Sequence, residues 1–249
     1  MNSQTDAELL SAYAERRSEP AFAELVRRHV DLVYSAALRM VCDSHLAQDV
    51  TQSVFVALAK NAAQITDRRV LSGWLHRTAQ NIAAETVRTD VRRRAREQEA
   101  AAMNQLLATE PDLSRRSGPE ADAWEHIAPQ LDAALGELTD PDRDAVLLRY
   151  FERKSAREMA QILGTSEDAA QKRVSRAVER LREFFAKRGV TVGASGLVVV
   201  ISANAVQAAP AGLAVTIATA ATLTGTTIAA ATTAIAMTTL QKSLVSVII

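Results

Sequence analysis

The sequence predicts an all-α protein with two small helical domains, a flexible linker between them and an apolar tail rich in Ala and Thr. Aromatic residues make up only 4% of the 249 residues, and Gly and Pro are few. Helix-forming residues with apolar positions at helical spacing dominate the first three quarters of the chain. Pro, Gly and Ser interrupt that periodicity near residues 111–119, which is typical of a linker. The expected boundaries are 6–99 for the first domain, 100–120 for the linker, 121–188 for the second domain and 189–249 for the tail.

The first domain should contain long amphipathic helices. Residues 22–42 place one apolar stripe at helical spacing: Phe22, Leu25, Val26, His29, Val33, Ala36, Ala37 and Met40. Residues 45–62 predict a second helix, with Leu46, Val50, Val54, Ala57 and Leu58 inward. A loop is expected over 61–72, followed by a third helix over 73–97. The one cysteine, Cys42, follows an apolar run and is expected to be a buried small hydrophobe.

The second domain should end in a helix-turn-helix. Leu131, Leu135 and Leu138 belong to one predicted helix, and Pro141 suits the first turn of the next. Ser155 and Glu158 have capping-box spacing, Gly164 suits a left-handed helix end, and Thr165 with Asp168 offers a second capping box. Two short-linked helices of this kind are typical of a helix-turn-helix.

Charge is unevenly distributed although the formal net charge is zero. Residues 68–96 hold eight arginines against two acids, whereas residues 110–144 hold ten acids against three bases. Residues 172–188 turn basic again, with seven bases against two acids. Two basic segments on either side of an acidic one suggest a polyanion bound at two points.

The helix over residues 166–185 has two opposed faces. Ala170, Val174, Ala177, Leu181 and Phe184 share the apolar face, while Gln171, Lys172, Ser175 and Arg176 share the polar one. A recognition helix in the major groove needs such donors on its outer face, and Arg173 and Arg180 lie further round, where phosphates are the natural partners. The alternative is an ordinary solvated helix.

Two further surfaces invite interpretation. The arginine-rich helix carries Trp74, His76, Arg77, Gln80 and Asn81 upstream, which suits opened DNA, although Trp74 could equally belong to the core. Asp49, Gln52 and Phe55 lie three residues apart, off the apolar stripe. An exposed Phe beside two polar residues indicates a protein contact; the alternative places Phe55 underneath.

The sequence contains no signature of an enzyme. A glycine-rich phosphate loop, a Cys/His metal spacing and a nucleophile elbow are all missing from it. We therefore expect no catalytic residue, no metal and no cofactor.

The order FAELVRRHVDLVYSAALRM, AQDVTQSVFVALAK, GWLHRTAQNIAAETVR and the helix-turn-helix resembles the sigma-70 family of RNA polymerase sigma factors. More narrowly, it is similar to the extracytoplasmic-function (ECF) group, which keeps conserved regions 2 and 4. The resemblance implies that the first domain is region 2 and the second is region 4. Its implied partners are core RNA polymerase, through the β′ clamp helices and the β flap, and promoter DNA, and it admits an anti-sigma factor.

The resemblance also assigns roles by position. It implies that Asp49, Gln52 and Phe55 bind the β′ clamp helices, and that the loop over 61–72 holds a base flipped out of the −10 element. The implied −10 contacts are Trp74, Arg77, Gln80, Asn81 and Arg88. The implied −35 contacts are Ser166, Gln171, Lys172, Arg173, Ser175 and Arg176. The other interpretation of the same sequence is a helix-turn-helix regulator that does not act as a polymerase subunit.

The tail carries no established role in this resemblance. It has no charge between Arg188 and Lys242, and residues 211–237 are long enough to span a bilayer. One hypothesis is membrane attachment of residues 190–249, although Ala and Thr contribute little transfer energy. The other is a partner-binding or self-packing segment that masks one DNA-binding domain. The polar, acidic start of the chain predicts a cytoplasmic body without a signal peptide.

Overall fold

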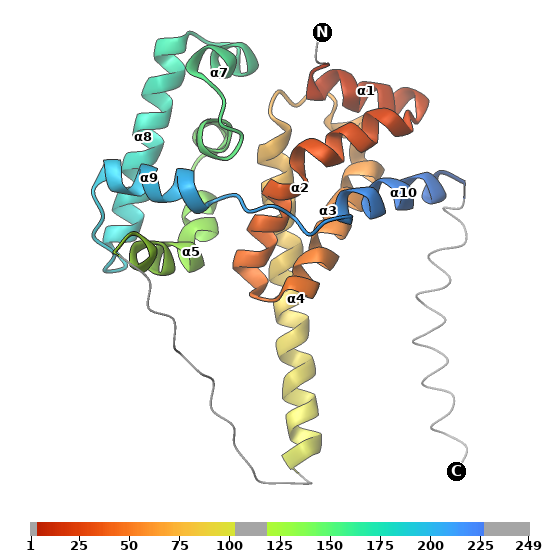
Figure 1. Cartoon of the computed structure of the whole chain (residues 1–249), viewed down its shortest axis with the longest axis horizontal. Helices are drawn as coiled ribbons and strands as arrows, with labels where there is room; N and C mark the ends of the chain where they lie inside the picture. The colour runs from red at the N-terminus through yellow and green to blue at the C-terminus, as the bar shows by residue number, and fades with distance from the viewer. Residues whose placement is uncertain (1–3, 103–118, 227–249) are drawn as a thin grey trace.

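The computed structural model describes residues 4–102 and 119–226, and every regular element in these residues is helical (Figure 1). This confirms the all-α prediction. The N-terminal domain comprises α1 (Asp6–Arg16), α2 (Glu19–Val41), α3 (Ser44–Ile65) and α4 (Leu71–Ala102). The second domain comprises α5 (Pro119–Glu137), α6 (Asp140–Val146), the π-helical turn η1 (Leu147–Phe151), α7 (Ala156–Leu163) and α8 (Glu167–Ala186). The tail adds α9 (Ala194–Asn204) and α10 (Leu213–Thr226).

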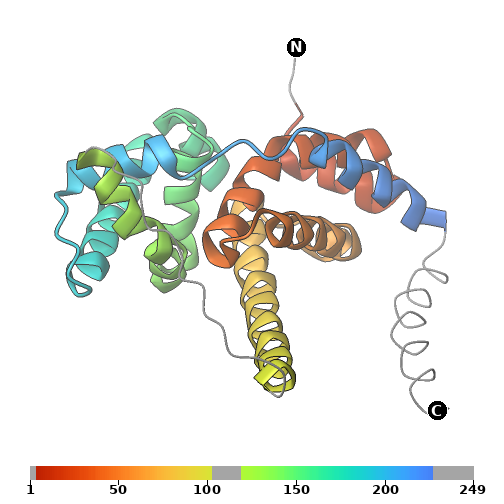
Figure 2. The same ribbon diagram turned by 60° about the horizontal axis from the view of Figure 1, so that its bottom comes forward.

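Helix α2 lies at the centre of the N-terminal domain and packs against α1, α3 and α4. The predicted stripe is its buried face: Leu25, Val26 and Val33 are fully buried, and of the predicted residues only Met40 is partly exposed. Burial of each large side chain contributes about 1.5–3 kcal/mol. Beyond the bundle, the second half of α4 projects away from both domains (Figures 1 and 2), so the arginine-rich segment stands clear of the core.

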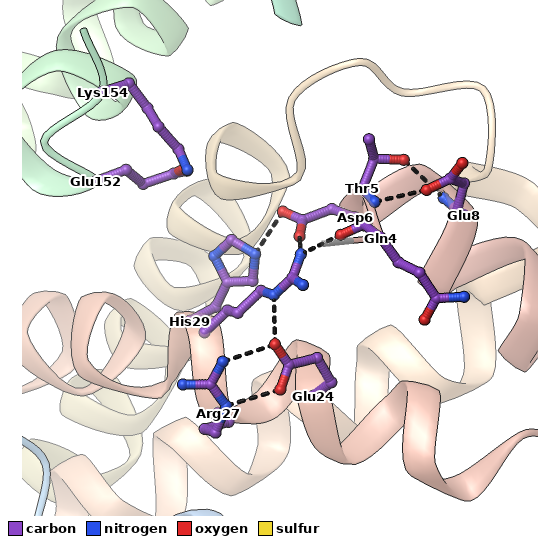
Figure 3. Close-up of polar contacts among 10 residues, drawn as sticks. Gln4, Thr5, Asp6, Glu8, Glu24, Arg27, His29, Glu152 and Lys154 are labelled. Carbon is purple, nitrogen blue, oxygen red and sulfur yellow. Dashed lines mark hydrogen bonds and ion pairs between the residues drawn. The ribbon is translucent and has the colours of Figure 1, made fainter. Parts of the chain in front are cut away.

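Short polar motifs set the helix ends of the N-terminal domain. Thr5 and Glu8 form a reciprocal capping box at the start of α1 (Figure 3). Helix α2 ends where Cys42 turns left-handed, at φ 53°. The expected burial of Cys42 is wrong, because this turn carries the residue out of the apolar stripe and leaves it exposed.

The helix-turn-helix of the second domain has the predicted geometry with one correction. Ser155 and Glu158 form the expected capping box of α7, and Gly164 adopts φ 63° at its end. The expected box between Thr165 and Asp168 is wrong: Ser166 is the N-cap of α8, and its hydroxyl accepts a hydrogen bond from the Ala169 amide at 3.1 Å. The turn therefore includes Thr165, and α8 begins one residue later than that box would place it.

The tail packs against both domains. Helix α9 lies against α5, α8 and η1, whereas α10 lies against α2 and α3 (Figure 1). Residues 205–212 cross between them in an extended path (Figures 1 and 2). Of the helices described, none combines the length and hydropathy that a bilayer crossing requires. The proposed span over 211–237 runs past residue 226 and so lies partly outside the described residues.

A carboxylate at the start of α1 ties this helix to α2. Asp6 lies 2.7 Å from Nε2 of the buried His29 and 2.9 Å from Arg28 (Figure 3). Burial alone would raise the pKa of Asp6, but the hydrogen bond with His29 and the contact with Arg28 outweigh it and lower the pKa to about 2. The ionised form is therefore the one that stabilises the fold.

We expect Asp6→Asn to lower the free energy of unfolding at pH 7 by about 1–2 kcal/mol. A carboxylate whose pKa is depressed contributes stability above its unfolded pKa of about 4, and loses it as the pH falls toward 2. The difference between the two proteins should thus shrink from pH 5 to pH 2 in urea unfolding curves. Glu19→Gln, which removes an exposed charge at the start of α2, is the control. A difference that stays constant with pH would contradict the role of this ion pair.

Candidate polymerase and nucleic-acid interfaces

Helix α8 presents its predicted polar face to solvent. Ala170, Ala177 and Leu181 are fully buried, while the opposite face exposes Gln171, Lys172, Ser175 and Arg176. Lys172 Nζ lies 2.8 Å from Asp168 one turn earlier, which is an exposed and therefore weak ion pair. The polar face of α8 is therefore exposed to solvent, where its side chains can donate hydrogen bonds to an extended ligand that carries acceptor groups.

Two other predicted residues of α8 lie outside this exposed row. The Ser166 hydroxyl caps the helix, and Arg173 is half-buried. Arg180, which lies further round, donates to Asp142 of α6 at 2.6 Å. Together with the buried apolar face of α8, which packs against α5, α6 and α7, this bond gives the exposed face a defined direction.

The predicted −10 residues divide between solvent and the second domain. Asn81 and Arg88 are exposed, and Trp74 is half-buried against the core. Gln80, however, donates from Nε2 to the backbone carbonyl of Asp132 in α5. Arg77 lies 3.2 Å from Asp140 at the start of α6. One face of α4 therefore contacts α5 and α6.

A buried ion cluster lies at the centre of this contact. The Asp132 carboxylate accepts two hydrogen bonds from the Arg39 guanidinium of α2, at 2.7 and 2.9 Å. His76 Nε2 of α4 lies 2.9 Å from the same carboxylate. All three side chains are at most 7% exposed. Burial alone would raise the pKa of Asp132, but the charge of Arg39 and the hydrogen bond from His76 outweigh it and lower the pKa to about 2.

Sequence reasoning missed Arg39 and Asp132 as a pair. Each is a single charge inside an apolar helical stretch, AALRMVC for Arg39 and IAPQLDAAL for Asp132. Lys, Arg and Asp are rarely buried unless they are paired, so two lone charges of opposite sign were the available signal. Because 93 residues separate them in the sequence, no local pattern predicts that they are in contact.

The loop expected over 61–72 is shorter than predicted. Helix α3 continues to Ile65 and α4 begins at Leu71, which leaves 66–70 as the connection. Arg69 of this loop lies 3.3 Å from the Leu163 carbonyl, at the turn of the helix-turn-helix. The segment that the resemblance assigns to a flipped base thus faces the second domain.

Of the two placements that the sequence left open for Phe55, the exposed one is wrong and the buried one is confirmed. Asp49 and Gln52 are exposed on α3, but Phe55 is fully buried. Asp49 and Phe55 are six residues apart, so their side chains point in directions that differ by roughly 120° around the α-helix. That rotation brings Phe55 from the side of Asp49 to the stripe of Val54 and Leu58. Only Asp49 and Gln52 remain available for a protein contact.

Phe55→Ala should therefore reduce the free energy of unfolding by about 3–5 kcal/mol, the usual cost of emptying a buried aromatic site. Urea unfolding followed by circular dichroism measures this. Gln52→Ala, one turn away on the solvent face, serves as the matched control and should change stability by less than about 0.5 kcal/mol. Equal stability of the two variants would restore Phe55 as a surface residue.

Asp144 of α6 is pressed against the start of α4. A Cβ placed on Gly73 would lie 1.9 Å from its Oδ1, so glycine is what permits this approach. Burial raises the pKa of Asp144 to about 6, while Arg143 and Arg68 act to lower it and Asp140 and Glu152 to raise it. The protonated form is thus favoured when the domains are together.

Lowering the pH from 7 to 5 should strengthen the contact between the domains. In the separated state the carboxyl returns to a pKa near 4, so the closed state binds the proton more tightly and is stabilised as the pH falls through 6. Asp144→Asn should hold the domains together more strongly at pH 7 and lose this part of the pH response. A distance measured between labels on the two domains tests it; identical pH profiles of the two proteins would rule out Asp144 as the titrating group.

Comparison with known proteins assigns both domains. Residues 25–96 match the family model "Sigma-70 region 2", and residues 129–181 match "Sigma-70, region 4". The first match covers most of α2 to α4 and the second covers most of α5 to α8. A helix-turn-helix regulator that works without polymerase has no need of the first.

Individual relatives agree. The chain is 30% identical to the ECF RNA polymerase sigma factor SigE of Mycolicibacterium smegmatis over 186 residues, which are 74% of this chain and 68% of that one. It is 31% identical to the RNA polymerase sigma-E factor of Streptomyces avermitilis over 167 residues, 67% of this chain and 86% of that one. Among solved structures it is similar to CnrH in complex with the cytosolic domain of CnrY, at 24% identity, a TM-score of 0.36 and coverage of 73% and 97%. The two family models and the two sequence relatives show that the chain belongs to the sigma-70 family and, within it, to the extracytoplasmic-function group of RNA polymerase sigma factors.

Proposed function

We propose that α8 reads the −35 element of the promoter as duplex DNA. The observation that carries this is the exposed row Gln171, Lys172, Ser175 and Arg176 opposite a fully buried face. Lysine and arginine can donate to guanine O6 and N7, and glutamine to adenine. Arg173 and the N-terminal turn at Ser166 lie beside this row, where phosphate oxygens would fix the register.

The N-terminal domain would open and hold the −10 element. Asn81 and Arg88 are exposed on α4, and Arg77 and Gln80 would join them once the second domain has moved away. Trp74, which is half-buried, offers an aromatic edge near the loop over 66–70. Flipping a base costs a few kcal/mol, so the arginine-rich half of α4 must supply backbone attraction to offset it.

The contact with core polymerase would lie on the outer face of α3. Asp49 and Gln52 are exposed there one turn apart, beside the exposed Ser53. A charged and an amide side chain on a rigid helix suit a polar rim contact with a helical partner. Phe55 supports this surface from below by packing in the core.

Reconstituted transcription tests these roles directly. Purified full-length protein, core polymerase and a library of promoters should give initiation at a restricted set of sequences with related −35 and −10 elements. Asp49→Ala with Gln52→Ala should weaken core binding without altering which promoters are chosen. Binding of duplex sites without core binding or initiation would contradict the proposal.

The recognition helix allows a sharper prediction. Lys172→Ala or Arg176→Ala should cost about 1–3 kcal/mol of discrimination between the preferred −35 sequence and its single-base variants. Lys187→Ala removes the same charge at the end of α8, away from the reading face, and should lower affinity slightly for all sequences. Competition binding at fixed salt measures both. Equal weakening on every sequence for all three variants would mean that Lys172 and Arg176 touch only phosphate.

A further inference from the structure

Helix α2 binds the extended part of the tail through one row of polar side chains. Asp31, Ser35 and Arg39 are four residues apart and so lie on one face of the helix. Asp31 Oδ1 accepts from the Ala209 amide at 2.8 Å. The buried Ser35 hydroxyl accepts from the Gln207 amide at 2.7 Å and donates to the Gln207 carbonyl at 3.1 Å. Arg39 Nη1 donates to the Ala205 carbonyl at 2.6 Å.

Apolar residues anchor the tail on both sides of this row. On the second domain, Leu197 and Ile201 of α9 are each 1% exposed. On the N-terminal domain, Leu213 and Ile217 of α10 are 9% and 3% exposed. These four side chains belong to the same continuous apolar cluster as the cores of the two domains. The extended segment, residues 205–212, therefore joins two anchors on different domains.

Arg39 connects the tail to the contact between the domains. One guanidinium nitrogen binds the Ala205 carbonyl, and the other two bind Asp132 of α5. Because the guanidinium is planar and its donors have fixed directions, tail binding holds the side chain in the orientation that receives Asp132. Tail binding and domain contact therefore favour each other.

We propose that residues 194–217 act as an intramolecular strap that keeps this sigma factor closed, with α2 as the docking surface for residues 205–209. In the closed state, Gln80 of α4 is bonded to α5 and partly buried, while Arg77 and Arg69 contact Asp140 of α6 and the Leu163 carbonyl. The strap lowers the fraction of molecules whose promoter-binding face is accessible, and so lowers apparent affinity for the promoter in proportion.

This inference rests on the proposed function in one respect: the two domains read elements that are far apart. The −10 and −35 elements are separated by roughly 25 base pairs, which is about 85 Å at 3.4 Å per base pair. Domains that touch through Gln80 and Asp132 cannot occupy both elements. Opening is therefore a required step, and the strap opposes it.

The domain distance is the most direct readout. Cys42 is the one cysteine of the chain and is exposed on the N-terminal domain. Glu167→Cys adds a second at the exposed start of α8, and spin labels on the pair report the distribution of distances in the full chain. The labelled protein should give one narrow distribution, and the same protein ending at Arg188 should give a broader one.

A pair of substitutions at one position isolates the strap from general effects of truncation. Gln207→Pro removes the amide that donates to Ser35, whereas Gln207→Ala keeps both backbone bonds and changes only an exposed side chain. Gln207→Pro should raise the open fraction roughly two- to tenfold, the factor that corresponds to one hydrogen bond. Gln207→Ala should match the parent.

Transcription with core polymerase separates failure of the strap from failure of the proposed function. More initiation from Gln207→Pro and from the truncated chain than from the parent and Gln207→Ala supports the strap. Equal initiation and equal distances in all four proteins overturn it and leave the sigma role intact. If no protein initiates while the distances respond as expected, the strap stands and the proposed function fails.

Discussion

The arrangement of the two domains depends on one buried carboxylate. The Asp132 carboxylate is buried away from water, so its charge is stabilised by Arg39 and His76 instead. These two residues come from two helices of the other domain. Such a cluster differs from an apolar seam in one important respect. The desolvation cost of the charges offsets most of their attraction, and each of them regains water when the domains separate. A contact built in this way is specific in its geometry but modest in its net free energy, as the proposed opening of the two domains requires.

One face of α4 contacts the second domain and, in the proposed function, also binds the promoter. Gln80 uses its amide on a backbone carbonyl of α5, and Arg77 lies beside a carboxylate of α6. In the proposed function, both acceptors take positions that a nucleic acid would fill with base edges and phosphates. Asp132 and Asp140 of the acidic segment would then replace the polyanion at α4. Closure and promoter binding would compete for the same donors.

Local patterns predicted the helices well because burial follows helical spacing. The stripe from Phe22 to Ala37, the capping box of Ser155 and Glu158 and the left-handed Gly164 depend only on residues within a few positions of one another. Errors arose where a rotation of about 100° per residue decided the result, as at Phe55, or where a helix end turned the chain, as at Cys42. The choice of Ser166 over Thr165 is of the same kind, since adjacent hydroxyls offer nearly equal caps. Pairing of Arg39 with Asp132, and of α2 with the tail, depends on contacts across 93 or more residues, for which spacing holds no information.

The hydrogen bonds between α2 and the tail use main-chain atoms of residues 205, 207 and 209 and none of their side chains. They constrain the number of residues between the anchors more than residue identity, except at Ala205, whose side chain is buried in the apolar cluster. Over evolutionary time the exposed positions of this segment could change while the docking survived, provided that no proline appeared at 207 or 209 and no residue was gained or lost. Related chains with the same strap would then share a fixed number of residues between two apolar helices. A sequence alignment scored on residue identity would not detect this similarity.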